Sequence, residues 1–193
     1  MRTLALIALA VFSSSALAQA SVRVRGTIRE ASADSLKVRS RDGRDITVHL
    51  APGTQVAVAK PLKLADIKAG TYLGVTSVRG PDGRLVAKEV HTLPPQAPAG
   101  HMAWDLVPGS SMTNANLTST SRASGGNEIT LSYEGGSQTI LVTPQTAVVT
   151  FAPGRLADLK PGETIFTIAR VEGDGTFATQ RISVSKDGVK PPQ

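Results

Sequence analysis

Cysteine is absent from the 193-residue sequence, and this absence excludes several kinds of chemistry. A chain without thiols forms neither disulfide bonds nor thiolate metal sites, and it has no cysteine nucleophile. The fold must therefore be stabilised by its hydrophobic core alone.

Long apolar runs are also missing. The longest, from Leu4 to Phe12, is far shorter than the ~20 residues that a helix needs to cross a bilayer, so we expect no transmembrane segment. This run follows the basic residue Arg2 and precedes small residues that end at Ala20, a pattern typical of a secretory signal peptide. Residues 1–20 are therefore predicted to be a signal peptide, and the mature protein is predicted to be periplasmic or secreted.

Aromatic residues make up only 4% of the chain, whereas the formal net charge is +6. Near the start of the mature chain, Arg23, Arg25, Lys37 and Arg39 alternate with apolar residues. Such a basic face could bind an envelope polyanion such as an anionic polysaccharide or lipid. Because single-stranded nucleic acids stack on aromatic side chains, the scarcity of aromatics argues against nucleic acid as the partner.

The chain contains an internal repeat. Residues 64–70, LADIKAG, match residues 156–162, LADLKPG, at an offset of 92 residues. Residues 52–56 and 144–148 match at the same offset. Self-similarity at a fixed offset is the signature of a duplicated structural unit.

Each unit has the residue pattern of a small β domain. In the first unit, apolar and polar residues alternate over 22–28, 36–39 and 46–50, which predicts three strands. A helical turn at 64–68 and a final hairpin over 72–90 complete the unit, and the second unit repeats this order.

We therefore predict an all-β protein made of two tandem small OB-like barrels, each with five to six strands and one short helical turn. A β-sandwich is the alternative. The predicted boundaries are a first OB-like domain at 21–93, a Pro/Gly-rich connector at 94–118, a second OB-like domain at 119–188 and a frayed tail at 189–193.

The connector carries the residues to which we assign a structural role. Trp104, the only tryptophan, is expected to bury its ring against a neighbouring domain while its indole N–H finds an acceptor. Asp105 precedes a Pro-Gly turn and is expected to bond to its own backbone. Met112 and Asn114 are assigned to the same structural connector.

A metal site is the alternative role for this region. His91 and His101 lie ten residues apart, with Met102 and Met112 nearby. Imidazole and thioether ligands together suit a soft ion such as copper. His91 and His101 are thus possible ligands of copper or another transition metal; otherwise no cofactor is expected.

No catalytic residues are predicted. Ser110 and Ser111 lie close in sequence to His101 and Asp105, but nothing like G-x-S-x-G surrounds them. Walker loops and H-E-x-x-H motifs are absent as well. We therefore predict a non-enzymatic binding or scaffolding protein, whose partner is a periplasmic protein or a small ligand.

Short motifs along the chain carry a family resemblance. They include residues 89–91 (EVH), 104–106 (WDL), 112–115 (MTNA) and 149–154 (VTFAPG). Together they resemble a family of exported proteobacterial proteins that contain a domain of unknown function, usually described as a small OB-like barrel. The resemblance implies tandem barrels and export but no catalytic residues. Some members are labelled metal ABC transporter permeases, a label that does not fit a sequence without membrane spans.

Overall fold

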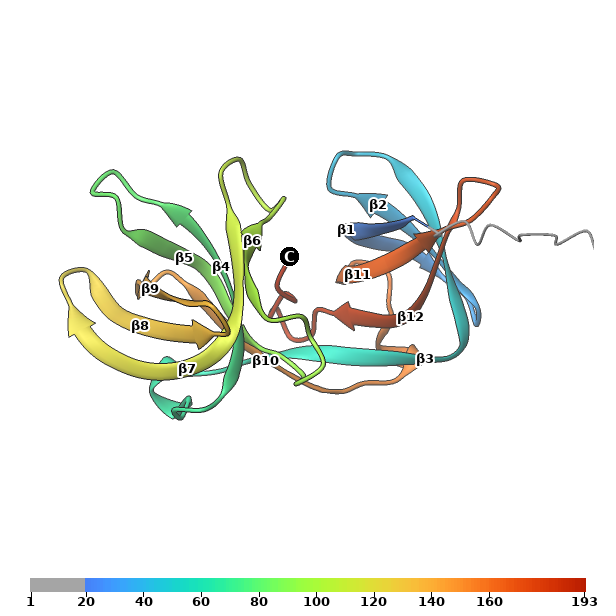
Figure 1. Ribbon diagram of the computed structural model, residues 1–193. Coiled ribbons are helices and arrows are strands. Elements are labelled where there is room, and N and C mark those ends of the chain that lie inside the picture. Colours follow the sequence, from blue (N-terminus) through green and yellow to red (C-terminus); the bar gives the residue numbers. More distant parts are fainter. Residues whose placement is uncertain (1–19) are drawn as a thin grey trace, which may run out of the picture.

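The computed structural model describes residues 20–193, where nearly all regular structure is β-strand (Figure 1). The helical elements in this range are two 3₁₀ turns, η1 (Leu64–Asp66) and η2 (Leu156–Asp158). The strands are β1 (Ser21–Ala31), β2 (Ser35–Ser40), β3 (Asp45–Pro61), β4 (Tyr72–Arg79), β5 (Leu85–Thr92), β6 (Gly100–Ala103), β7 (Ser111–Ala123), β8 (Gly126–Tyr133), β9 (Gly136–Val142), β10 (Ala147–Pro153), β11 (Thr164–Val171) and β12 (Phe177–Val184). The all-β prediction is confirmed.

The predicted signal peptide, residues 1–20, lies outside the described residues except for Ala20. Within residues 20–193, no helix has the length and apolar character that crossing a membrane requires.

The strands close into two five-stranded barrels. In the first barrel, the ring runs β1, β2, β3, β12, β11 and back to β1, and the contact between β3 and β12 is parallel. In the second barrel, the ring runs β7, β8, β9, β5, β4 and back to β7, and the contact between β9 and β5 is parallel. Closure removes the free sheet edges, as in OB-like barrels.

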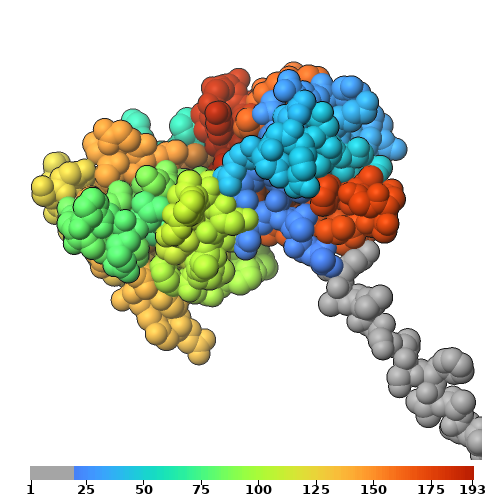
Figure 2. Space-filling model, turned by 90° about the horizontal axis from the view of Figure 1, so that it is seen from above, coloured from blue at the N-terminus to red at the C-terminus, as the bar shows by residue number. Residues whose placement is uncertain are grey.

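Each barrel combines strands from both sequence repeats. The first barrel takes β1–β3 from the first repeat and β11–β12 from the second, whereas the second takes β7–β9 from the second repeat and β4–β5 from the first. The repeats have thus exchanged their last hairpins. Figure 2 shows this by colour, because one lobe joins blue and cyan residues to red ones from the end of the chain. The predicted domains, 21–93 and 119–188, would each have formed a barrel from one repeat alone. The observed barrels each combine strands of both repeats.

The exchange is made by β3 and β10, which cross between the barrels. Residues 57–61 of β3 pair antiparallel with residues 149–153 of β10. At the centre of this pairing Ala59 lies opposite Phe151, its own equivalent at the offset of 92 residues. The crossing therefore lies on the pseudo-twofold axis that relates the repeats, the geometry of a domain-swapped dimer joined into one chain.

The two hydrophobic cores have the same mixed origin. The first contains Leu36 and Val38 of the first repeat together with Ile165 and Ile182 of the second, all fully buried. The second core packs Leu73 and Val75 of the first repeat against Ile129, Leu131 and Ile140 of the second. Neither repeat can bury its apolar residues without the hairpin of the other.

The connector is shorter than predicted. Strand β6 pairs with β7, and β7 begins at Ser111, so residues 111–118 belong to the second barrel. Met112 and Asn114 therefore lie on a barrel strand and not in a linker.

The predicted frayed tail is instead packed between the barrels, where the label C marks its end in Figure 1. Pro191 and Pro192 are buried, and the backbone N–H of Gln193 donates to Glu89 of β5. The polar sequence of the tail did not reveal these contacts.

Hairpin exchange predicts where core substitutions act. Ile182→Ala and Ile140→Ala both empty a fully buried site in the second repeat, and each should cost about 2–5 kcal/mol of unfolding free energy. Amide hydrogen exchange should accelerate in β1–β3 for Ile182→Ala and in β4–β5 for Ile140→Ala. If both variants loosened only strands of the second repeat, the exchange would be disproved.

Candidate functional site

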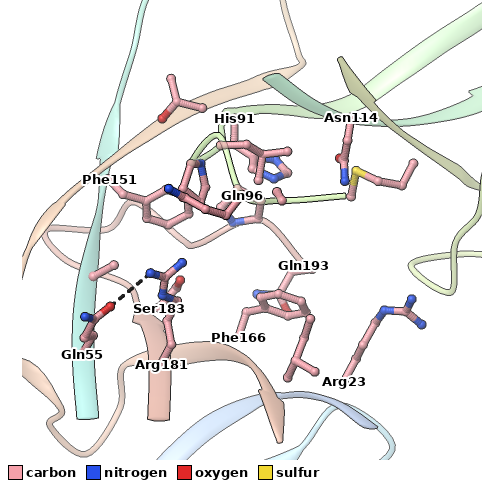
Figure 3. A pocket seen from close by; sticks show the side chains of 18 of the residues that line it. Arg23, Gln55, His91, Gln96, Asn114, Phe151, Phe166, Arg181, Ser183 and Gln193 are labelled. Carbon is pink, nitrogen blue, oxygen red and sulfur yellow. Dashed lines mark hydrogen bonds between the residues drawn. The ribbon is translucent and has the colours of Figure 1, made fainter. Parts of the chain in front are cut away.

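A cavity of about 980 Å³ lies between the two barrels and is the candidate site (Figure 3). Its walls are the outer faces of barrel strands. Because side chains alternate along a strand, residues next to the core residues point into this space. On β3, Val58 enters the first core while Gln55 and Ala57 line the cavity.

The first barrel supplies one wall. Its register places Phe166 of β11, Ser183 of β12 and Ala57 of β3 in one row, with Arg181 opposite Gln55 beside it. Ile168, also on β11, is 60% exposed, the largest exposed fraction among the large hydrophobic residues of the described chain. This wall combines apolar side chains with the guanidinium of Arg181.

The second barrel supplies the opposite wall. The register aligns Gly100, Asn114, Gly74 and His91 across four strands, from β6 to β5. Met102 and Met112 pair two rows away, on the same face of the sheet, and also line the cavity. Figure 3 shows His91 and Asn114 on one side and Phe166, Arg181 and Arg23 on the other.

His91 is held deep in the second wall, with only 8% of its surface exposed. Its ring crosses Gly74 so closely that a Cβ at position 74 would lie 2.5 Å from Nε2. The ring meets Phe151 edge-on at 6.3 Å between centroids, and Nδ1 has no hydrogen-bond partner in the described structure. Burial lowers the pKa of His91 to about 4, so the imidazole is neutral at pH 7.

Glu89, two residues before His91, fastens the tail. Its carboxylate accepts hydrogen bonds from Oγ1 of Thr76 at 2.9 Å and from the backbone N–H of Gln193 at 3.0 and 3.1 Å. Burial raises the pKa of Glu89 to about 7, although these hydrogen bonds act in the opposite direction. The indole N–H of Trp104 donates to the carbonyl oxygen of Gln193 at 3.0 Å, so the tail is held from both sides.

Two arginines of β1 hold the connector. Arg25 is 6% exposed and donates two hydrogen bonds to the carboxylate of Asp105, at 2.7 and 3.1 Å. These bonds hold the pKa of Asp105 below its usual range. The guanidinium of Arg23 lies 4.0 Å from the ring centroid of Trp104, a cation–π contact. Trp104 and Asp105 are thus placed to fix the connector against the first barrel.

The predicted basic face is not a single exposed surface. Arg25 is buried against Asp105, while Lys37 pairs with Glu30 at 2.7 Å and Arg39 with Asp45 at 3.0 Å. Alternation correctly predicted that the side chains of Arg23 and Arg25 on β1 point away from the core. The connector covers that face of β1.

The structure does not bring His91 and His101 together. His101 pairs with Thr113, one row away from the row of His91, so the two rings lie on opposite faces of the sheet. Three strand spacings separate them, roughly 14 Å. Nδ1 of His101 lies 2.8 Å from Oγ1 of Thr113. Among the residues described, no group of three or more histidines and carboxylates could hold a metal ion.

The cavity therefore gathers only part of the residues selected from the sequence. Those that line it are Arg23, His91, Trp104, Met112 and Asn114, whereas Arg25, Lys37, Arg39, His101 and Asp105 do not. Sequence reasoning missed Phe151, Phe166, Ile168 and Arg181. One signal was present in β11, where Phe166 and Ile168 make the strand apolar on the face that points away from the core.

Comparison with known proteins adds one finding. Residues 25–91 match a family model described as a domain of unknown function (DUF5666). The DUF5666 match runs from β1 into β5, which is one sequence repeat, and its strands contribute to both barrels. No curated protein and no solved structure matches the chain.

The buried carboxyl of Glu89 predicts a pH effect. Its pKa is about 7 in the folded protein against an ordinary value of 4.5, so stability should fall as the pH rises through this window. Glu89→Gln keeps a neutral acceptor and should be more stable than the unaltered protein by about 3 kcal/mol at pH 8, but not at pH 4.5.

Chemical denaturation of both proteins across this pH range measures the difference. The low pKa of His91 makes stability rise with pH between about 4 and 6.5, and this effect cancels because both proteins contain His91. Parallel stability profiles for the two proteins would contradict the role given to Glu89.

Proposed function

We propose that this protein is an exported, non-enzymatic binding protein that holds an apolar small molecule between its two barrels. The observation that carries the proposal is the cavity of about 980 Å³. Its volume lies in the range typical of small-molecule sites, about 300–1,000 Å³. Its apolar lining includes Met102, Trp104, Met112, Phe151, Phe166 and Ile168.

The exposure of the lining supports a ligand. Ile168 leaves 60% of its surface in contact with solvent although it projects from a regular barrel strand. Burying apolar surface contributes roughly 25 cal/mol per Å², so a molecule that covers these side chains gains binding free energy without rearranging either core.

The construction of the walls also favours a preformed site. Each wall belongs to a different barrel, and the barrels are linked by the crossing of β3 with β10. The ion pair of Arg25 with Asp105 and the contacts of Gln193 with Glu89 and Trp104 hold the edges of the gap. When the lining residues are already held in place, the protein loses less conformational entropy on binding a ligand.

The hydrogen bonds of Ser110, in the connector, support the proposal that the protein is not an enzyme. The hydroxyl of Ser110 lies 2.9 Å from the carbonyl oxygen of Trp104 and 2.7 Å from that of Val107, so it is occupied in the turn. Export to the periplasm is supported by the pattern of residues 1–20 and by the resemblance to exported proteobacterial proteins with tandem barrels.

A neutral apolar dye tests the proposed function. N-phenyl-1-naphthylamine should bind with one-to-one stoichiometry and accept excitation energy from Trp104, the only tryptophan, which lines the cavity. Ala57→Phe places a phenyl ring in the cavity from β3, against the apolar lining, and should weaken dye binding at least about tenfold. The matched control is Ala123→Phe, a half-buried alanine at the end of β7 that does not line the cavity.

Fluorescence titration measures the affinities, and circular dichroism checks that both variants are folded. Absence of dye binding to the unaltered protein, or equal affinity in Ala57→Phe and Ala123→Phe, would contradict the cavity as the ligand site.

A further inference from the structure

The charged side chains that line the cavity are of one sign. Arg23 and Arg181 line it, and no aspartate or glutamate is among the lining residues in the described chain. The apolar side chains of the walls favour an apolar ligand, and the two guanidinium groups favour a ligand with a negative charge.

The two arginines are not equivalent. Arg23 already lies over Trp104 at 4.0 Å and near Asp105 at 3.7 Å. Arg181 forms no ion pair within residues 20–193, and its one side-chain hydrogen bond is donated from Nη2 to the neutral Oε1 of Gln55 at 3.0 Å, the dashed line in Figure 3. Gln55 orients the guanidinium without neutralising it, which leaves further N–H groups for an anion.

The opposite wall carries two uncharged polar side chains among its apolar residues. His91 is neutral and more than nine-tenths buried, and its Nδ1 lacks a partner. Oδ1 of Asn114, two strands away in the same row, is also without a partner. The Nδ2 group of the same amide donates to the carbonyl oxygen of Pro98. Buried polar atoms without partners are costly, and a ligand group that bonds to them recovers this cost.

We infer that the ligand of the cavity is an apolar acid, with one oxyanion bound by Arg181 and a neutral hydrogen-bonding group that reaches His91 and Asn114. This inference rests on the proposed function. The apolar body lies between these two ends, against Phe151 and Phe166. A guanidinium matches the geometry of a carboxylate, and a single unpaired guanidinium suits a monoanion.

Three amphiphiles with the same twelve-carbon chain and different charge test the oxyanion. Dodecanoate, dodecanol and dodecyltrimethylammonium are each used to displace N-phenyl-1-naphthylamine from the unaltered protein. Dodecanoate should bind at least about tenfold more tightly than the other two, the gain expected from a charge-assisted hydrogen bond. Arg181→Gln should reduce dodecanoate to the affinity of dodecanol and leave dodecanol unchanged.

The matched control is Arg122→Gln, which removes the same charge from an exposed arginine of β7 outside the cavity. It should leave the affinity for dodecanoate unchanged. Equal loss in Arg122→Gln and Arg181→Gln, or equal affinity for the three amphiphiles, would overturn the inference while dye binding still supported the proposed function. Failure of the neutral dye to bind would reject both.

The neutral end is tested with 12-hydroxydodecanoate. His91→Phe keeps an aromatic ring across Gly74 and should lower the affinity for the hydroxy acid at least about threefold, with little effect on dodecanoate. Asn114→Ala provides a second variant in case His91→Phe does not fold. Identical affinity ratios for the two acids in all folded variants would overturn the assignment of this end of the ligand.

Discussion

The pairing of β3 with β10 on the pseudo-twofold axis is the constraint on which the rest of the structure depends. Because both strands continue past their own barrels, the hairpin that follows each of them completes the barrel of the other repeat. Both cores therefore draw on the whole chain. The DUF5666 match covers one repeat, so the segment that the family model describes closes no barrel by itself in this protein.

The same crossing produces the space between the barrels. Two outer strand faces are brought opposite each other, and the connector and the tail occupy their edges. Burial there favours uncharged forms, as the shifted pKa values of His91 and Glu89 show, while Arg25 is compensated by Asp105. Arg181 is the cation that this network leaves without an acidic partner in the described chain. The ligand chemistry that we propose follows from this distribution of charge.

Much of the fold could be predicted from the sequence, because alternation and turn residues are local signals. The two helical turns, the duplication and most of the strands were found in this way, but β6 and most of β7 had been assigned to the connector. The exchange could not be, since Leu73 and Val75 show the same alternation whichever barrel their hairpin completes. For the site, His91, Trp104 and Met112 were selected because their residue types are rare in this chain, and Asn114 because it belongs to the connector motif. Arg181 and Phe166 lie in ordinary alternating strands, and only the packing of two barrels gives them a common cavity.

Disulfide trapping tests the exchange most directly, since the chain has no cysteine of its own. Val22 of β1 lies opposite Ala169 of β11, whereas a repeat that closed on itself would place it opposite Ser77, the equivalent of Ala169 in β4. Paired residues of antiparallel strands are within reach of a disulfide. Under mild oxidation, Val22→Cys/Ala169→Cys should form an intramolecular disulfide and Val22→Cys/Ser77→Cys should keep free thiols, as measured by mass spectrometry. The reverse result would contradict the exchanged barrels and the cavity between them.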